Sequence, residues 1–254
     1  MSNGGKESLL EVRNLTKRFR GVIANQDINM EVNSGEIIGL IGPNGAGKTT
    51  LFNMITGTRP KGASRLPDSG AVYFKRVKIT GMKPNSICKL GLVRTFQLVR
   101  IWEEMTVLEN VMTGVFRAMR SAREARKKSE DLLKFTGLYT KLDYLGSSLT
   151  IADKKRLEIT RALGTKPDLL LLDEPMAGLT TTEINEALEL IRQIHDQGIT
   201  VLLVEHVIEA VMSIAHRVVV LDNGQKIADD RPEKVARDKR VIEAYLGEEY
   251  HVKS

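Results

Sequence analysis

The sequence offers little that is typical of a secreted or membrane-spanning protein. It contains one cysteine, Cys88, among 254 residues, which excludes an internal disulfide and favours a reducing compartment. No apolar run approaches the ~20 residues that a helix needs to cross a bilayer. The first residues, MSNGGKES, are polar and contain no apolar segment, so we expect no signal peptide.

The chain also lacks internal repeats, low-complexity tracts and any cluster with the spacing of metal ligands. Its composition, 42% hydrophobic and 28% charged, is ordinary for one globular domain or a core with a subdomain. The net charge of +6 could favour nucleic acid, an anionic membrane surface or nucleotide. Because the basic residues are scattered, the charge alone is weak evidence.

The most specific stretch is GLIGPNGAGKTTL, residues 39–51. It fits the P-loop pattern G-x-x-x-x-G-K-[ST] and lies between an apolar strand, residues 37–41, and an apolar helix. Glycines let the backbone N–H groups of such a loop approach phosphate oxygens, and the helix N-terminus adds a favourable dipole. Lys48 would reach the β- and γ-phosphates, and the Thr49 hydroxyl would bind Mg²⁺. The alternative is a glycine-rich turn with a surface lysine.

The second specific stretch is DLLLLDEP, residues 168–175. Four consecutive leucines suit a strand buried on both faces. The strand ends in Asp173 and Glu174, at the carboxyl end where α/β sheets place ligands. The first acid would hold Mg²⁺, as in P-loop enzymes, and the second could be a general base for water. In the alternative the two acids cap a following helix, which Pro175 disfavours.

Three other positions each have two interpretations. His206 ends a strand predicted over residues 199–204 and could touch a γ-phosphate, although a lone histidine is usually structural. Gln97 follows a short apolar stretch and by itself carries no functional meaning. Phe19, at the end of a strand predicted over residues 9–19, either stacks on an adenine or packs in the core.

Residues 105–146 have helical periodicity, and Thr106 with Glu109 predicts a capping box. The charged run over residues 117–131 could face nucleic acid or a membrane, but its interspersed acids favour a solvated helix face. We therefore expect a helical subdomain inserted into an α/β core.

A helix is predicted over residues 149–164, with a capping box of Thr150 and Asp153 at its start. Its Lys154-Lys155-Arg156 run could meet phosphates or be solvated.

Early antiparallel strands before the P-loop predict a mixed sheet. Further along we expect a hairpin with an Asn223-Gly224 turn and a last helix from Pro232 to about residue 247.

These motifs together resemble those of the ATP-binding-cassette ATPases over roughly residues 9–247. The order of the P-loop, Gln97, the DLLLLDEP strand and His206 carries the family resemblance. Within the family the chain is most similar to the ATPase subunits of branched-chain amino acid importers, through GLVRTFQ, EMTVLENV, KRLEITRAL, EPMAGL, LLVEHV and VIEAYLGE.

The resemblance implies one ATPase domain: a P-loop NTPase core with an N-terminal antiparallel β subdomain, over residues 9–101 and 165–247, and an inserted α-helical subdomain over 102–164 that carries the signature helix. It implies that ATP and Mg²⁺ bind and that Phe19 stacks on adenine. The implied catalytic residues are Glu174, which polarises water, His206, which holds the γ-phosphate, and Gln97, which senses the γ-phosphate and Mg²⁺. The implied Mg²⁺ ligands are Thr49, Gln97 and Asp173, and the implied nucleotide-binding residues are Gly42, Pro43, Asn44, Gly45, Ala46, Gly47, Lys48, Thr49, Thr50 and, toward a partner subunit, Thr150.

Members of this family work as head-to-tail pairs. The resemblance therefore implies a second ATPase subunit, in a homo- or heterodimer, and transmembrane permease subunits at the cytoplasmic face of the membrane. A solute-binding protein would act indirectly, and no nucleic acid partner is expected. The solute stays open between branched-chain amino acids, other amino acids, amides and urea, because the ATPase does not touch it. The alternatives are a soluble cassette acting on nucleic acid or ribosomes and a low-turnover regulatory subunit.

The sequence departs from the family pattern at two places. The family signature Leu-Ser-Gly-Gly-Gln is LTIAD here, residues 149–153, so Ile151 and Ala152 replace glycines that let backbone N–H groups approach phosphate. The loop after Glu174 usually ends in Asp, and here that position is Thr180. The part of the site that serves the partner subunit is therefore in question, while the P-loop side is intact.

The signature departure leads to a first prediction. Thr150 and Asp153 satisfy their own helix start, and Ile151 adds bulk where a glycine would admit the partner's phosphate. With hydrolysis blocked by Glu174→Gln, we expect Mg-ATP to dimerise the isolated subunit only weakly. Replacing Ile151 and Ala152 by glycine should strengthen the dimer, at up to ~1 kcal/mol of helix stability per glycine. Sedimentation with and without the glycine pair measures this, and a tight dimer with the natural sequence would contradict it.

Overall fold

A computed structural model describes residues 8–59, 64, 66–97, 99–116, 119 and 121–251, with side chains described up to residue 245. The strands are Ser8–Phe19 (β1), Val22–Asn33 (β2), Ile37–Ile41 (β3), Ser69–Phe74 (β4), Val77–Lys78 (β5), Leu92–Arg94 (β6), Leu169–Asp173 (β7), Thr200–Val204 (β8), Arg217–Asp222 (β9) and Gln225–Asp230 (β10). The α-helices are Lys48–Thr56 (α1), Pro84–Leu90 (α2), Val107–Val115 (α3), Ala122–Phe135 (α4), Ile151–Gly164 (α5), Thr181–Asp196 (α6), Ile208–Ile214 (α7), Pro232–Val235 (α8) and Lys239–His251 (α9).

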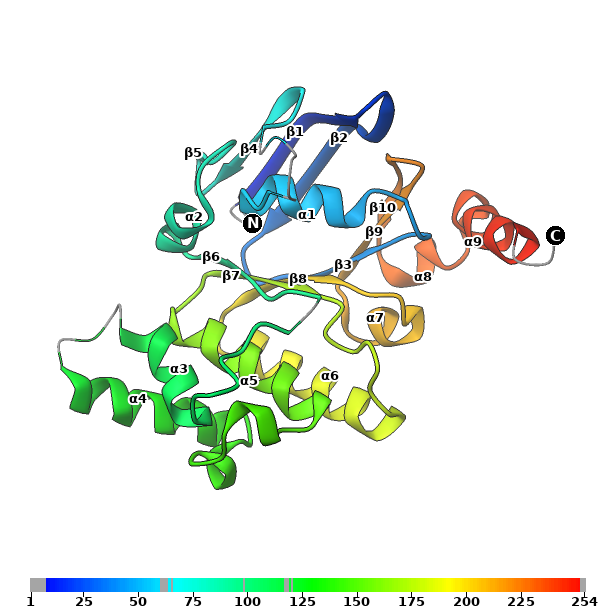
Figure 1. Ribbon diagram of the computed structural model, residues 1–254. Helices are drawn as coiled ribbons and strands as arrows, with labels where there is room; N and C mark the ends of the chain where they lie inside the picture. Colours follow the sequence, from blue (N-terminus) through cyan, green and yellow to red (C-terminus); the bar gives the residue numbers. More distant parts are fainter. Residues whose placement is uncertain are drawn as a thin grey trace, which may run out of the picture.

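The strands form two sheets, which Figure 1 shows one above the other. The upper sheet has the order β2-β1-β4-β5 and is antiparallel throughout. The second has the order β10-β9-β3-β8-β7-β6 and is parallel except where β10 pairs with β9. The predicted fold class is confirmed: a mixed sheet forms the α/β core, and the early antiparallel strands form a sheet of their own.

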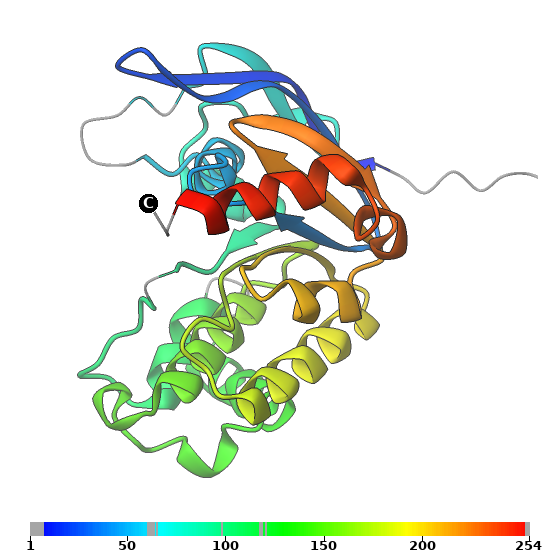
Figure 2. The same cartoon turned by 90° about the vertical axis from the view of Figure 1, so that its right-hand side faces the viewer.

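Alternate residues of β3 belong to two different hydrophobic cores. Ile38 and Leu40 pack into the core between the two sheets, together with helix α1, which Figure 2 shows between them. Ile37 and Ile41 point to the opposite face, where α5, α6 and α7 cover the second sheet. A strand buried on both faces reads as a continuous apolar run, which explains the IIGLI sequence of β3.

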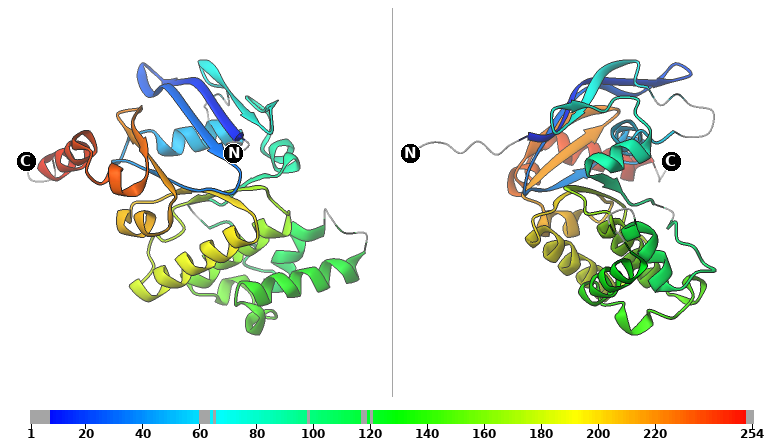
Figure 3. Two further views of the ribbon diagram at one scale, coloured as in Figure 1. Left: turned by 180° about the vertical axis from the view of Figure 1, so that it is seen from behind. Right: turned by 90° about the vertical axis from the view of Figure 1, so that its left-hand side faces the viewer.

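Helices α3, α4 and α5 form a third core of their own (Figure 3). Helix α5 takes part in two cores, since its Leu157 packs with α3 and α4 while its Ile159 packs against the second sheet. The helical subdomain predicted to insert into the α/β core is therefore attached to it through α5, and Leu132 and Phe135 of α4 add to the contact. The exact boundaries of this subdomain, residues 102–164, stay a prediction.

Most local predictions are confirmed. Thr106 and Glu109 form both bonds of the capping box of α3. Asn223 and Gly224 have φ angles of 45° and 76°, as a tight hairpin turn requires. In the predicted charged run, α4 carries an exposed Arg126–Glu130 ion pair, which fits a solvated face; residues 117, 118 and 120 of the run lie outside the described chain, as do residues 1–7.

The prediction of a single last helix from Pro232 is wrong. The chain forms two helices, α8 and α9, because Asp238 between them begins the second one. Its Oδ1 accepts a hydrogen bond from the Arg240 backbone N–H at 2.9 Å, in the manner of an N-cap. Among the described residues, no helix combines the length and the apolar character that crossing a membrane requires.

The crossing of α3 and α5 depends on Gly114. A Cβ at this position would lie 2.3 Å from the backbone oxygen of Arg161, which cannot turn away as a flexible side chain could. We predict that Gly114→Ala lowers the free energy of unfolding by about 1–3 kcal/mol, the usual cost of overpacking. Urea unfolding measures this, with Thr113→Ala on the same helix as the control. Unchanged stability would show that the two helices separate without cost.

Candidate active site

The expected site residues lie at one edge of the second sheet. The paired strands β3, β8, β7 and β6 are parallel, so their carboxyl ends meet at the same edge. The P-loop follows β3, and Gln97 follows β6. Asp173 ends β7, and His206 follows β8. Ligands of open α/β sheets bind at this edge.

Two glycines of the P-loop have no room for a side chain. Gly42 has a φ of 151°, and a Cβ on it would lie 2.0 Å from the Leu221 backbone oxygen. Gly47 has a φ of 98°, and its Cβ would lie 2.3 Å from the Ala24 oxygen. Gly47 is also the N-cap of α1. The loop is therefore packed against β2 and β9 by its backbone, while the N-terminus of α1 stays available to an anion.

The Lys48 side chain turns back onto this loop. It is 6% exposed, and its Nζ donates to the backbone oxygens of Gly42 at 2.6 Å and Pro43 at 2.8 Å. A buried ammonium needs such acceptors. Since the ammonium lies within the loop, phosphate oxygens placed over the loop would compete with these two carbonyls for it.

The Glu174 carboxylate lies between two of the predicted residues. Gln97 Nε2 donates to Glu174 Oε2 at 2.8 Å, and His206 Nε2 lies 2.8 Å from Glu174 Oε1. The three side chains line a hollow of about 270 Å³. The P-loop residues along its wall are Asn44, Gly45, Ala46, Gly47, Lys48, Thr49 and Thr50. Four strand ends thus bring a phosphate-type cradle and a carboxylate together.

The backbone of Glu174 is in an unusual conformation. Its φ is 51°, in the left-handed region that costs a non-glycine residue on the order of 1–3 kcal/mol. Its N–H donates to the Val204 oxygen at 2.9 Å, and its own carbonyl accepts from Lys155 Nζ at 2.8 Å. The prediction that Lys155 meets phosphate or solvent is therefore wrong. Lys155 is buried because it is bonded to the backbone at the end of β7.

Asp173 pairs with an arginine that the sequence did not single out. The Asp173 side chain is 2% exposed, and its Oδ2 accepts from Arg94 Nη2 at 2.5 Å. Arg94 Nη1 donates to Asn53 Oδ1 of α1 at 2.7 Å. In the sequence, the one indication of this ion pair is that a charged residue, Arg94, ends the apolar stretch GLVR. The ion pair joins β6 to β7, and the bond to Asn53 joins both strands to α1, the helix that follows the P-loop.

Two buried glutamates hold the loops around the hollow. Glu158 of α5 accepts from the Phe96 N–H at 3.3 Å and the Arg100 N–H at 3.4 Å, on both sides of Gln97. Glu205 accepts from the Met176 N–H at 2.6 Å and the His206 N–H at 3.0 Å. Burial raises the pKa of both carboxyl groups, and their backbone hydrogen bonds oppose it. Neither glutamate was predicted to take part in the site.

Phe19 and Thr150 are not among the residues that line the hollow. Phe19 is half-buried at the end of β1, with Lys17 Nζ 5.3 Å from its ring centre. Both of its interpretations stay predictions. Thr150 caps α5, as expected, through a bond from the Asp153 N–H at 3.2 Å. A full capping box would also have the Asp153 carboxylate accept from the Thr150 backbone N–H. Here the carboxylate accepts from the Thr150 hydroxyl and from Lys141 instead.

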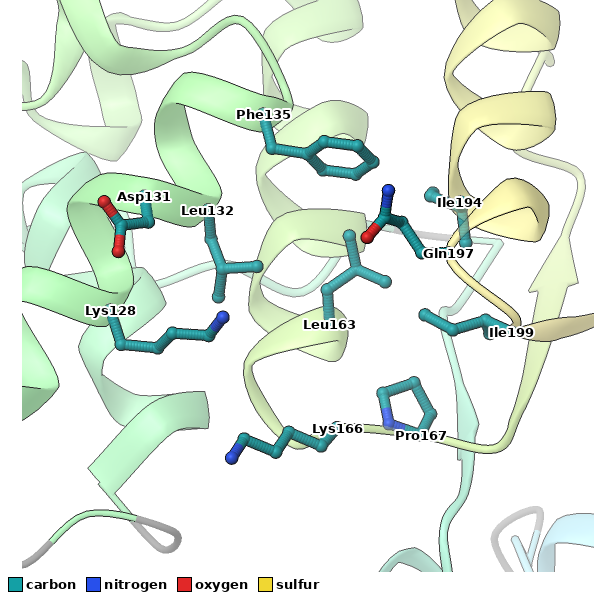
Figure 4. Close-up of a pocket in the computed structure, with 10 residues that line it drawn as sticks. All are labelled: Lys128, Asp131, Leu132, Phe135, Leu163, Lys166, Pro167, Ile194, Gln197 and Ile199. Carbon is teal, nitrogen blue, oxygen red and sulfur yellow. The ribbon is translucent and has the colours of Figure 1, made fainter.

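A second hollow lies at the opposite edge of the sheet (Figure 4). It measures about 340 Å³ and is bordered by α4, the end of α5 and the end of α6. Figure 4 shows Leu132, Phe135 and Leu163 along its apolar wall, with Lys128 at one side. Its lining residues include neither the P-loop nor Glu174. The hollow over the P-loop is therefore the better candidate for a nucleotide.

Comparison with known proteins agrees with this geometry. Residues 25–177, more than half of the chain, match the ABC transporter family, and residues 225–251 match the family described as branched-chain amino acid ATP-binding cassette transporter. The chain is 38% identical over 258 residues to the high-affinity branched-chain amino acid transport ATP-binding protein LivG of Escherichia coli (strain K12), covering 95% of this chain and 99% of that protein. It is 31% identical over 244 residues to the lipopolysaccharide export system ATP-binding protein LptB of the same strain, covering 96% and 99%.

The fold agrees as well. A crystal structure of the ADP conformation of an ATP-binding cassette of an ABC transporter superposes with a TM-score of 0.84 and 32% identity, covering 95% of this chain and 99% of that one. The same conclusion follows from the order of motifs, from the strand ends that meet at the site and from these matches. The chain belongs to the ATP-binding cassettes of ABC transporters, which bind and hydrolyse ATP.

Proposed function

We propose that this cassette powers an importer of branched-chain amino acids. The match of residues 225–251 to the branched-chain family carries the proposal, because it concerns the chain beyond the shared ATPase motifs. The similarity to LivG, whose name includes branched-chain amino acid transport, supports it. The similarity to LptB is spread over the cassette too, so the cassette alone does not select a solute.

In the proposed mechanism the chain binds ATP by its phosphates. Backbone N–H groups of the P-loop, residues 42–50, and the Lys48 ammonium would surround the β- and γ-phosphates, and Lys48 would exchange its two carbonyl acceptors for phosphate oxygens. Thr49, Gln97 and Asp173 would supply the oxygen ligands that Mg²⁺ prefers beside phosphate, Asp173 through the carboxylate oxygen that Arg94 does not hold. Bound Mg²⁺ would neutralise charge on the phosphates. The ion pair with Arg94 fixes the Asp173 carboxylate in place.

Glu174 is proposed as the base that polarises the attacking water. Its carboxylate is held by Gln97 and His206 at 2.8 Å each, so its direction is set before ATP arrives. His206, 43% exposed at the rim, would then hold the γ-phosphate. Catalysis of this kind depends on positioning and on charge stabilisation rather than on covalent chemistry. Phe19 would stack on the adenine.

The cassette would act with other chains. Thr150 at the start of α5 would meet ATP bound to a second ATPase subunit. Transmembrane permease subunits would hold the pair at the cytoplasmic face of the membrane, and a solute-binding protein would deliver the solute to them. Ile151 is 61% exposed at the first turn of α5, which keeps a low-turnover regulatory subunit as the second candidate.

Purification of the tagged chain from membranes of its own cell tests the proposal. We expect permease subunits to copurify and ATP hydrolysis by the reconstituted assembly to rise with leucine, isoleucine or valine and the binding protein. Glutamine and urea serve as control solutes. Stimulation by a control solute alone, or purification without any permease subunit, would contradict the proposed import function.

The proposed base gives a separate prediction. Glu174→Gln keeps the size of the side chain and one acceptor oxygen, but it replaces the other oxygen by a donor NH₂ group and removes the basicity. We expect ATP to bind normally while turnover falls roughly 10²–10⁴-fold, the range for a general acid–base group. Phosphate release and calorimetry measure the two quantities, with Glu189→Gln on the exposed face of α6 as the control. Hydrolysis at the normal rate would exclude Glu174 as the base.

A further inference from the structure

Lys155 is a buried cation at a position that the ATP-binding motifs do not include. The residue is 9% exposed, whereas the side chain of its neighbour Lys154 on α5 is 23% exposed and pairs with Glu103. Burial lowers the pKa of its ammonium, and the charges of Glu205, Glu174 and Glu158 oppose this. A buried charge is costly unless it is paired and hydrogen-bonded. The Lys155 ammonium therefore requires a hydrogen-bond acceptor inside the fold.

That acceptor belongs to the strained residue of the site. Lys155 Nζ donates to the backbone oxygen of Glu174 at 2.8 Å. On the other side, the Glu174 N–H donates to the Val204 oxygen at 2.9 Å. The left-handed backbone is thus held by β8 through its N–H and by α5 through its carbonyl. Strained conformations persist where the surrounding structure fixes them in this way.

The Glu174 carbonyl also accepts from the Ala177 N–H, at the longer distance of 3.3 Å. Removing the ammonium would leave this weaker bond as the remaining one that the structure describes at a buried carbonyl, without the charged donor. Glu174 is 8% exposed, so water does not readily replace the lost bond. Its backbone would relax toward the usual region of φ, and such a rotation changes the direction of the side chain. The carboxylate would then leave its place between Gln97 and His206.

We propose that Lys155 is a positioning residue for ATP hydrolysis, which holds the main chain of Glu174 so that its carboxylate stays between Gln97 and His206. The proposal rests on the proposed function, since it takes Glu174 as the base. Lys155 acts through Glu174 and touches no reacting atom.

The same helix also supports the other side of the carboxylate. Glu158, one turn after Lys155 on α5, accepts from the N–H groups of Phe96 and Arg100, which flank Gln97. A movement of α5 therefore shifts Glu174 and the Gln97 segment together. In Figure 1 this helix lies directly beneath the sheet that carries both. The positioning role thus gives the helix that begins at Thr150 a direct influence on the base.

Three variants of the full chain test the role. Lys155→Met keeps the length of the side chain and removes the donor, whereas Lys155→Arg keeps a donor. Lys154→Met is the matched control, because this neighbouring lysine pairs with Glu103 at the surface. We expect Lys155→Met to lower kcat about tenfold or more while the ATP dissociation constant stays within about twofold. Lys155→Arg should recover part of kcat, and Lys154→Met should change neither quantity.

A double-mutant cycle separates positioning from a general structural role. In the Glu174→Gln background, Lys155→Met should lower the residual turnover by less than about twofold, because the carboxylate that it positions is already absent. A loosened fold would lower turnover in both backgrounds alike. If Lys155→Met does not fold, Lys155→Gln serves in its place, since the shorter amide does not reach the carbonyl.

Two results would overturn the proposal: Lys155→Met or its substitute with at least half of the normal kcat, or an equal loss in both backgrounds. Normal turnover by Glu174→Gln alone is a different result. It would overturn the proposed function, whatever is measured at Lys155.

Discussion

The backbone of Glu174 turns into the left-handed region at the end of β7, and hydrogen bonds from two elements hold it there. Because of this turn, the side chain lies between the loop after β6 and the loop after β8 instead of continuing along the strand. Pro175 follows directly and adds a fixed φ of its own. The position of the carboxylate between Gln97 and His206 depends on this strained turn.

The support for this strain comes from both sides of the second sheet. On one side, Asp173 is tied through Arg94 to α1, and hence to the P-loop. On the other, α5 provides Lys155 and Glu158. Since α5 packs in the helical core as well as against the sheet, the helices α3 and α4 are mechanically connected to the site. A partner that moves these helices would act on hydrolysis through α5.

Much of the site could be predicted because its signals are local. The P-loop and the DLLLLDEP strand each combine chemistry and secondary structure within a short stretch, so their positions at strand ends followed from the pattern. The same holds for the caps at Thr106 and Thr150. The choice of Gln97 as a site residue needed the family resemblance, because nothing near it in the sequence indicates such a role, and its hydrogen bond to Glu174 was not predicted.

What could not be predicted depends on tertiary contacts. Lys155 belongs to a run of three basic residues, and only packing buries it while Lys154 and Arg156 pair with surface glutamates. Arg94 and Glu158 likewise find their partners across the fold. The break between α8 and α9 does have a local indication in the sequence, because Asp238 is a residue type that is common at helix N-caps.

The most direct test is a crystal structure of the Glu174→Gln protein with Mg-ATP. The account predicts that the phosphates lie over residues 42–50, with Lys48 Nζ bonded to them and released from the Gly42 and Pro43 carbonyls. It also predicts that φ at position 174 stays positive and that Lys155 stays on that carbonyl. A nucleotide bound elsewhere, with Lys48 still on the two carbonyls, would contradict the account.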